Sequence, residues 1–141
     1  MAPYRTEAVV LRTYDLGETD LILVLFSRAE GKISAVAKGS RKPKGRLVAG
    51  SQMFVHCDYL LYRGRNLDVV TQYEIVNAHR HIREDLERLA CASYAAELTS
   101  EMTHDRAPSP EVFDLLVWAL DSIENGGNLP AAVHVFELRF M

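Results

Sequence analysis

Hydrophobic and polar residues alternate with a period of two through most of the first half of the chain, which is the pattern of β-strands. Val55, Cys57 and Tyr59, for example, alternate with more polar neighbours. The same alternation, or a continuous apolar run of strand length, predicts five strands at residues 6–14, 21–26, 33–38, 53–61 and 67–75. Because five short strands in an open sheet would leave unpaired edges, the pattern favours a small closed barrel.

Beyond about residue 78 the hydrophobic period becomes that of an α-helix. Ile82 and Leu86 follow helical spacing, and they predict a first helix over residues 81–102. The sequence RAPSP then interrupts the pattern. Ser109 as N-cap, with Pro110 at the first helical position, is expected to start a second helix.

The second helix is expected to end at the Asn-Gly-Gly sequence of residues 125–127, and a third to run from about residue 130 to the end. The whole pattern predicts an α+β fold, with a five-stranded barrel in residues 1–78 and a helical domain in residues 79–141. The last helix ends on FELRFM without a cap or a polar tail. We therefore expect its aromatic side chains to be exposed, and the natural chain to continue beyond Met141.

Positive charge is concentrated in the first half of the chain, although the whole chain carries a net charge of -3. Residues 1–80 contain 12 Lys and Arg against 8 Asp and Glu, a net charge of +4, whereas residues 81–141 carry -7. The stretch KGSRKPKGR, residues 38–46, has five basic residues and no acidic one. Such a loop is typical of nucleic-acid binding, and the acidic half suits protein partners.

The glycines of this stretch do not form a phosphate-transfer motif. Gly39 and Gly45 enclose five residues, whereas a P-loop has four between its glycines, followed by Lys and then Ser or Thr. Gly45 is followed instead by Arg46 and Leu47, so nucleotide hydrolysis is not expected. A solvated surface loop without function remains the alternative interpretation of the same charges.

No sequence motif indicates catalysis, a metal or a cofactor. Hydrolase and metalloprotease signatures are absent, and no histidine has a cysteine or carboxylate at zinc-ligand spacing. We expect Cys57 and Cys91 to be buried free thiols in a reducing compartment. No apolar run is long enough for a membrane span and no secretory leader is recognisable, so we expect a cytoplasmic protein without membrane partners.

Aromatic residues gather in the strand half, where Phe54 and Tyr62 fall on the face opposite to Val55 and Tyr59. Small five-stranded barrels bind single strands by stacking bases on exposed aromatic rings within a positive groove. Phe54 and Tyr62 are therefore the better candidates for base stacking, although packing inside the protein is the role we favour for each.

Several stretches, in colinear order from about residue 6 to the end, resemble the bacterial RecO family of DNA repair proteins. The marks are VLR followed by LGExD in residues 10–20, AVAKGxR in residues 35–41 and REDLERL in residues 83–89. The resemblance implies an N-terminal OB-fold barrel followed by a helical domain. It also implies a non-catalytic mediator of recombination in DNA repair, without a cofactor.

Partners are implied by the same resemblance. RecO-like proteins bind single- and double-stranded DNA, anneal complementary strands, bind the acidic C-terminal tail of single-strand-binding protein, and act with RecR to load RecA. An apolar pocket with a basic rim, near Arg83, Arg88 or Arg139, would suit that tail. Many members continue into a region with a four-cysteine zinc site, and this chain ends before it, so no metal site is expected.

We predict that DNA phosphates contact basic side chains of the loop, a hairpin and the adjoining strands. These are Lys38, Arg41, Lys42, Lys44 and Arg46, supported by Arg63 and Arg65, with Arg12 and Lys32 as extensions. Such contacts neutralise phosphates without reading sequence, and they weaken with salt. Two alternatives remain open: an RNA-binding OB-fold module, for which the 2′-hydroxyl would matter, and a protein scaffold with an incidental basic loop.

Overall fold

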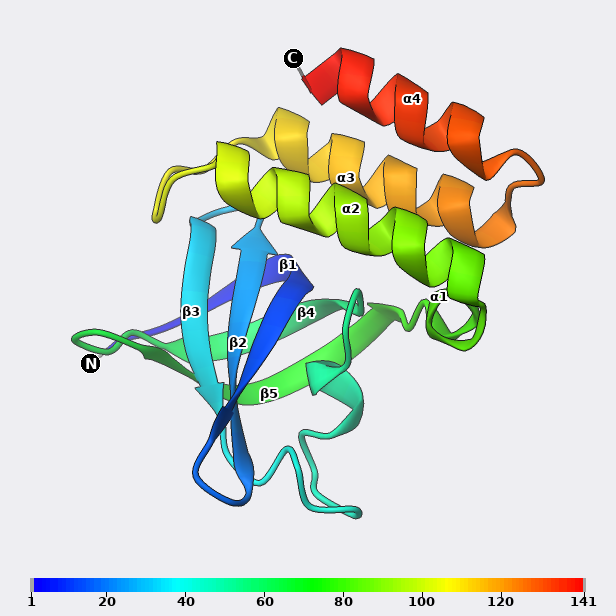
Figure 1. Ribbon diagram of the computed structural model, residues 1–141. Coiled ribbons are helices and arrows are strands. Elements are labelled where there is room, and N and C mark those ends of the chain that lie inside the picture. The colour runs from blue at the N-terminus through cyan, green and yellow to red at the C-terminus, as the bar shows by residue number, and fades with distance from the viewer. Residues whose placement is uncertain (1, 141) are drawn as a thin grey trace.

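The computed structural model describes residues 2–140 as a closed barrel with a layer of helices across one side (Figure 1). Five strands form the barrel: β1 (Pro3–Leu16), β2 (Asp20–Ser27), β3 (Gly31–Ala37), β4 (His56–Tyr62) and β5 (Asp68–Asn77). Their order around the barrel is β1-β2-β3-β5-β4. The predicted α+β architecture, a five-stranded barrel followed by helices, is confirmed.

β1 is the longest strand because it pairs with two neighbours. Its first half is antiparallel to β4 and its second half to β2. A register shift between Val10 and Arg12 lets the strand bend from one partner to the other. The barrel closes through a short parallel pairing of β3 with β5, in which Ala35 lies opposite Asp68. The outer sides of β1, β2 and β3 therefore form one continuous surface.

The barrel interior is filled by the alternate residues that the sequence pattern assigns to it. Val55, Cys57 and Tyr59 are fully buried there. The Tyr59 hydroxyl donates to the carbonyl oxygen of Gly50 at 2.7 Å, so the polar atom of this large side chain is satisfied. Burial raises the pKa of the Cys57 thiol to about 11. Both cysteines are free thiols, as predicted.

Four helices follow the barrel: α1 (Arg80–Glu84), α2 (Leu86–Met102), α3 (Pro110–Asn125) and α4 (Leu129–Phe140). The single helix predicted over residues 81–102 is wrong at Asp85, where extended backbone separates α1 from α2. The Asp85 carboxylate accepts a hydrogen bond from the Arg88 amide at 3.1 Å and caps α2. Leu86, whose spacing from Ile82 supported the single helix, is 82% exposed. Ser109 caps α3, as predicted.

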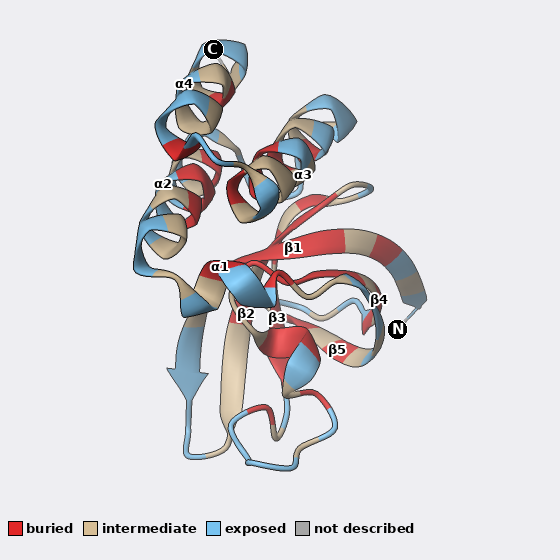
Figure 2. Cartoon of the chain, turned by 90° about the vertical axis from the view of Figure 1, so that its right-hand side faces the viewer, coloured by how far each residue is buried: buried red, intermediate tan, exposed pale blue. Residues whose placement is uncertain are grey.

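The helices share a hydrophobic core with the outer surface of the barrel, where Figure 2 shows buried residues along β1 beneath the helical layer. Val9 and Phe26 of the barrel pack with Phe113 and Leu116 of α3. Phe54, a candidate for base stacking whose favoured role was packing, is completely buried in the same core, so it packs and does not stack on bases. Its φ of 68° makes the chain turn there, so the strand alternation does not extend to this position.

α4 packs on α2 and α3 through an aromatic cluster. Phe136 is fully buried, and its ring centroid lies 5.4 Å from that of Phe140. The expectation that the aromatic side chains of the last helix are exposed is therefore wrong for Phe136. The predicted extension of this helix to Met141 concerns a residue outside the described part of the chain. No helix among residues 2–140 combines the length and apolar character needed to cross a membrane.

Candidate nucleic-acid interface

The first half of the basic loop, residues 38–46, is fastened to the hairpin that joins β1 and β2. The Gly39 amide donates to the Asp20 carboxylate at 2.8 Å. The Arg41 amide donates to the Thr19 carbonyl at 2.9 Å, and its guanidinium donates to the Gly17 carbonyl at 2.8 Å. These bonds fix the loop beside the end of the β1–β2 hairpin.

The second half of the loop is fastened to β5 instead. The Arg46 guanidinium donates to the Thr71 carbonyl at 2.6 Å, and the Tyr73 hydroxyl donates to the Arg46 carbonyl at 2.9 Å. Between the two attachments the backbone forms tight turns, in which a Cβ on Gly45 would lie 2.2 Å from the Gly39 carbonyl oxygen. The loop is therefore a folded strap between β2 and β5.

Three lysines of the loop, Lys38, Lys42 and Lys44, are exposed and form no ion pair with any described residue. The Asp20 carboxylate feels the charge of two of these lysines, Lys38 and Lys42. Its pKa is lowered chiefly by the hydrogen bond from the Gly39 amide, with smaller contributions from Thr19, Lys38 and Lys42. Most of the lysine charge therefore remains available to an anion from solution.

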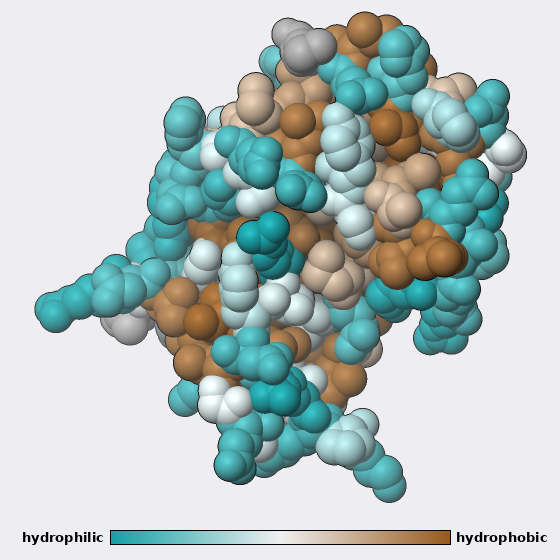
Figure 3. Space-filling model, viewed as in Figure 1, coloured by the Kyte–Doolittle hydropathy of each residue, from teal (hydrophilic) through white to brown (hydrophobic). Residues whose placement is uncertain are grey.

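The outer side of β1, β2 and β3 adjoins this loop and carries apolar and aromatic side chains. Tyr14 is 48% exposed, and it lies opposite the half-buried Ile22 of β2. Arg12 donates to the Tyr14 hydroxyl at 3.0 Å, on the same strand. In Figure 3 the surface over β2 and β3 is a mixture of pale and brown patches, with hydrophilic teal projections at the left and bottom. We call this region the sheet face.

The far end of the sheet face is bordered by the connection between β4 and β5. Arg63 pairs with Glu30 at 2.9 Å and lies 4.7 Å from the centre of the Tyr4 ring. Arg65 has no ion pair among the described residues. It lines a cavity of about 180 Å³, together with Lys32, Ile33, Ser34, Asn66, Asp105 and Arg106. Tyr62, the other predicted stacking residue, is 40% exposed at the end of β4.

Both predicted extensions from the strands have structural partners, as the two arginines of the loop do. The Lys32 ammonium donates to the carbonyl oxygens of Ser100 and Thr103, at 2.6 and 3.0 Å, and so binds the C-terminal end of α2. Only 16% of its side chain is exposed. Arg12 contacts Tyr14 and lies beside α2, where it lines a cavity with Glu97. Lys32 and Arg12 therefore have contacts within the protein, whereas the three lysines of the loop form no ion pair with a described residue.

One basic residue near the site, Arg106, was not predicted from the sequence. It lies in the connection between α2 and α3, and its guanidinium binds both carboxylate oxygens of the buried Asp68 at 2.7 Å. It also contacts Glu30 at 3.1 Å. No local pattern marks Arg106 as part of a site, because its contact joins residues 38 positions apart.

The histidines are occupied in local structure rather than gathered around an open site. His79 is buried against Glu124, with Nδ1 2.8 Å from the carboxylate, and burial is the main cause of its lowered pKa. His56 lies 2.9 Å from the Glu7 carboxylate. Among residues 2–140 no three His, Cys, Asp or Glu side chains are arranged to hold a metal ion.

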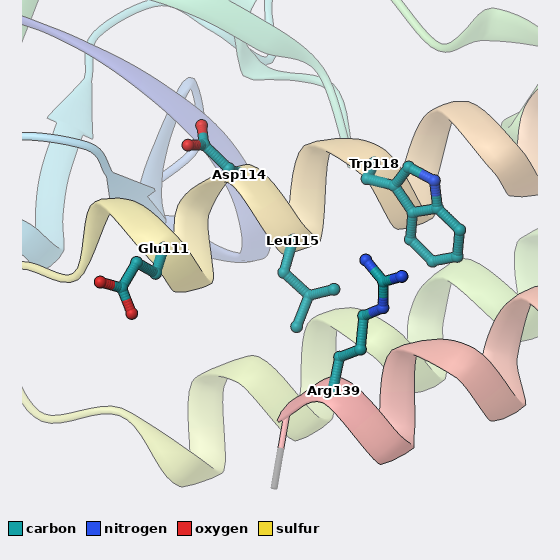
Figure 4. A pocket seen from close by; sticks show the side chains of 5 residues that line it. All are labelled: Glu111, Asp114, Leu115, Trp118 and Arg139. Carbon is teal, nitrogen blue, oxygen red and sulfur yellow. The ribbon is translucent and has the colours of Figure 1, made fainter.

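A separate cavity of about 420 Å³ lies between α3 and α4. Figure 4 shows the Arg139 guanidinium beside the Trp118 ring, with Leu115 between the helices and two carboxylates further along α3. The distance from the Arg139 guanidinium to the ring centre is 5.8 Å. The other two arginines proposed for a peptide pocket, Arg83 and Arg88, donate instead to backbone carbonyl groups.

Comparisons with known proteins agree with this fold. Residues 1–79 match the family model "Recombination protein O N terminal", and residues 83–141 match "Recombination protein O C terminal". The chain is 42% identical over 116 residues to "DNA repair protein RecO" of Bacillus cereus, covering 82% of this chain and 47% of the relative.

Two further relatives are similar in the same way. "DNA repair protein RecO" of Desulfitobacterium hafniense is 42% identical over 125 residues, which cover 89% of this chain and 46% of the relative. The Bacillus anthracis protein of that name is 41% identical over 116 residues, 82% of this chain and 47% of its own. The chain thus spans about half the length of the curated relatives it matches. It belongs to the RecO family of DNA repair proteins.

Proposed function

We propose that this chain binds single-stranded DNA as part of a non-catalytic recombination mediator. The strand lies along the sheet face, and the basic loop neutralises its phosphates. The observation that most supports this is the presence of three exposed lysines without ion pairs at the edge of a surface with exposed aromatic rings. Lysines release counterions from phosphates, and aromatic rings accept bases of any sequence by stacking.

The wider role is proposed from family membership. Double-stranded DNA would bind through the same loop, because phosphate contacts require no exposed bases. We further propose that the protein anneals complementary strands and acts with RecR to load RecA on DNA coated by single-strand-binding protein. These steps would take place in the cytoplasm, at the nucleoid.

The acidic tail of single-strand-binding protein would bind beside Arg139. Of the three arginines considered, Arg139 alone lies next to an exposed aromatic ring in an open cavity. Its guanidinium would receive the peptide carboxylate while Trp118 and Leu115 contact apolar side chains. Replacement of Arg139 by Ala should weaken binding of the tail peptide at least fivefold in a titration and leave DNA binding unchanged.

DNA binding itself is tested by fluorescence anisotropy with a labelled single-stranded DNA and an RNA of matched sequence. We expect the DNA to bind at low salt and to dissociate as salt is added. A clear preference for the RNA would favour an RNA-binding module, since only the 2′-hydroxyl distinguishes the two backbones. If neither the DNA nor the RNA binds, the proposal is contradicted, and a protein scaffold is the interpretation that remains.

A further inference from the structure

A second groove lies on the other side of the basic loop, along β5. Two cavities, of about 480 and 360 Å³, meet at Tyr73 and together form this β5 groove. The first is lined by Arg46, Gln72 and Tyr73. The second is lined by Tyr73 together with Gly45, Val48, Ala49, Gln52, Ile75, Ala78, Arg80 and Arg83.

The chemistry of the β5 groove suits a polyanion with apolar parts. Arginines line both of its cavities, and Arg46 and Arg80 are exposed. Ile75 is 45% exposed and supplies apolar surface between them. No carboxylate lines either cavity, whereas the cavity beside Trp118 is lined by two of them, from Glu111 and Asp114.

The walls of the β5 groove are held by the fold. Gly50 packs so closely on the Tyr73 ring that a Cβ there would lie 2.7 Å from a ring carbon, and this contact fixes the wall built by the loop. On the other wall, Arg83 donates to the carbonyl oxygens of Met53 and Ala78 at 2.9 and 2.6 Å. The groove is thus formed before any ligand arrives, which reduces the ordering cost of binding.

The basic loop separates this groove from the sheet face. Arg41 binds the β1–β2 hairpin and Arg46 binds β5, so the two arginines mark the two sides of one strap. Lys42 and Lys44 lie between them in the chain and are exposed. Their charge can therefore offset the repulsion between phosphates bound on the two sides of the loop.

We propose that the β5 groove binds a second nucleic-acid strand, so that one chain holds two single strands on opposite sides of the basic loop. This inference rests on the proposed DNA binding at the sheet face. The β5 lining runs over four residues, Gln72 to Ile75, and at about 3.3 Å each these give the groove a length of roughly 13 Å, which covers more than one phosphate of a strand. Two strands held on one loop meet at high effective concentration, which favours their pairing.

The test counts strands. A short oligothymidylate, which cannot pair with itself, is titrated into the protein, and the number bound is measured by analytical ultracentrifugation. We expect the unmodified protein to bind two oligomers and the variant with Gln72→Glu and Arg80→Glu to bind one, because carboxylates in the groove repel phosphates, with an affinity for the first within about twofold of the original. In a fluorescence assay with complementary strands, the variant should anneal them at least tenfold more slowly.

Control variants separate groove binding from damage to the fold. The exposed Arg80 side chain makes no hydrogen bond or ion pair with a described residue, so we expect Arg80→Ala to keep the fold and to weaken binding of the second oligomer at least fivefold. Arg5→Ala removes an exposed arginine from the half of β1 that pairs with β4. Arg5 pairs with Asp58 at 3.6 Å and lines neither cavity of the β5 groove, so the substitution should change the binding of neither oligomer. Circular dichroism verifies that each variant is folded.

Each failure has a distinct meaning. If no oligomer binds, the proposed function fails. If the unmodified protein binds only one oligomer, or if the double variant still binds two, the second strand is excluded from the groove. Polyglutamate is titrated as a second probe. If the double variant loses binding of polyglutamate but still binds two oligomers, the groove is a site for acidic peptides and the proposal is overturned.

Discussion

Asp68 is a buried carboxylate that joins the barrel to the connection between α2 and α3. Only 1% of it is exposed, and it accepts hydrogen bonds from Tyr4, Arg106 and the Gly64 amide. Burial on its own would raise the pKa of Asp68. The bonds from Arg106 and Tyr4 outweigh that effect, and the pKa lies below its ordinary value of 3.8.

Replacement of Asp68 by Asn should lower the free energy of unfolding by about 2 kcal/mol at neutral pH, because charge-assisted hydrogen bonds are lost. The pKa is lower in the folded chain than in the unfolded one. The carboxylate charge therefore stabilises the fold fully at pH values above the unfolded-state pKa. This stabilisation is lost as the pH falls through the folded-state pKa. In urea denaturation, the difference in the free energy of unfolding between the original protein and Asp68→Asn should become smaller in acid. A difference that does not change with pH would contradict this explanation.

Two glycines with positive φ should respond very differently to alanine. Gly17 has a φ of 64° and open space around it, so Gly17→Ala should cost about 1 kcal/mol of stability from backbone strain alone. Gly31 has a φ of 73°, and a Cβ there would lie 2.5 Å from the Ala107 backbone. Gly31→Ala should therefore cost about 3 kcal/mol, since the clash adds to the strain. Equal losses in thermal denaturation would show that this contact is unimportant.

Residue-level prediction from sequence succeeded where local pattern decides the outcome. Val55, Cys57 and Tyr59 are buried because strand alternation places them inside a closed barrel. Phe54 packs in the core, the role favoured for it, but its positive φ was not foreseen, because alternation carries no information about a single left-handed residue. Arg106 was missed because its site is made by contacts with residues that are distant in the sequence.

At the scale of elements, Lys32 was predicted to contact DNA but instead joins β3 to the end of α2. Its ammonium binds two carbonyl groups at the end of α2, where a helix leaves acceptors unpaired. Lys32→Met should lower stability by about 1 to 2 kcal/mol through the loss of these bonds. It should leave DNA affinity and its salt dependence unchanged. If Lys32→Met weakens DNA binding without lowering stability, Lys32 contacts DNA and this assignment is wrong.

The helical elements show what period alone can determine. Ser109 and the following proline start α3 where the sequence predicts, because N-cap chemistry is local. The break at Asp85 was missed, since Ile82, Leu86 and Leu89 keep helical spacing across it. The break lets α1 bury Ile82 against the barrel while α2 starts again in its own direction.

At the scale of the whole molecule, the barrel and the helices share one core, although the sequence divides naturally at about residue 78. Phe113 of α3 stacks on Phe26 of β2, with 6.5 Å between ring centres. We expect the two parts to unfold together. Trp118, the single tryptophan, reports on the helical layer, and far-ultraviolet circular dichroism reports on both layers.

Phe113→Ala should lower stability by about 3 to 5 kcal/mol, because it empties the core between the two layers. The transitions followed by fluorescence and by circular dichroism should still coincide. If the tryptophan signal of the variant changes at a lower urea concentration than the circular dichroism signal, the helices form an independently folding unit.

At the scale of the whole molecule, the positive charge of the basic loop comes from side chains with structural partners and from side chains without them. Arg41 and Arg46 of the loop also bind backbone carbonyl groups. Their removal would disturb the loop itself, so the three unpaired lysines give the cleaner test. Arg5, exposed and paired with Asp58, is a matched control.

The most direct test of the central claim is the salt dependence of single-stranded DNA binding by the variant with Lys38→Ala, Lys42→Ala and Lys44→Ala. Loss of three phosphate contacts should reduce the slope of log K against log salt by about 2 units, because each contact contributes about 0.7 on a single strand. Arg5→Ala should leave the slope unchanged. A triple variant with the original slope and affinity would show that the basic loop does not contact DNA.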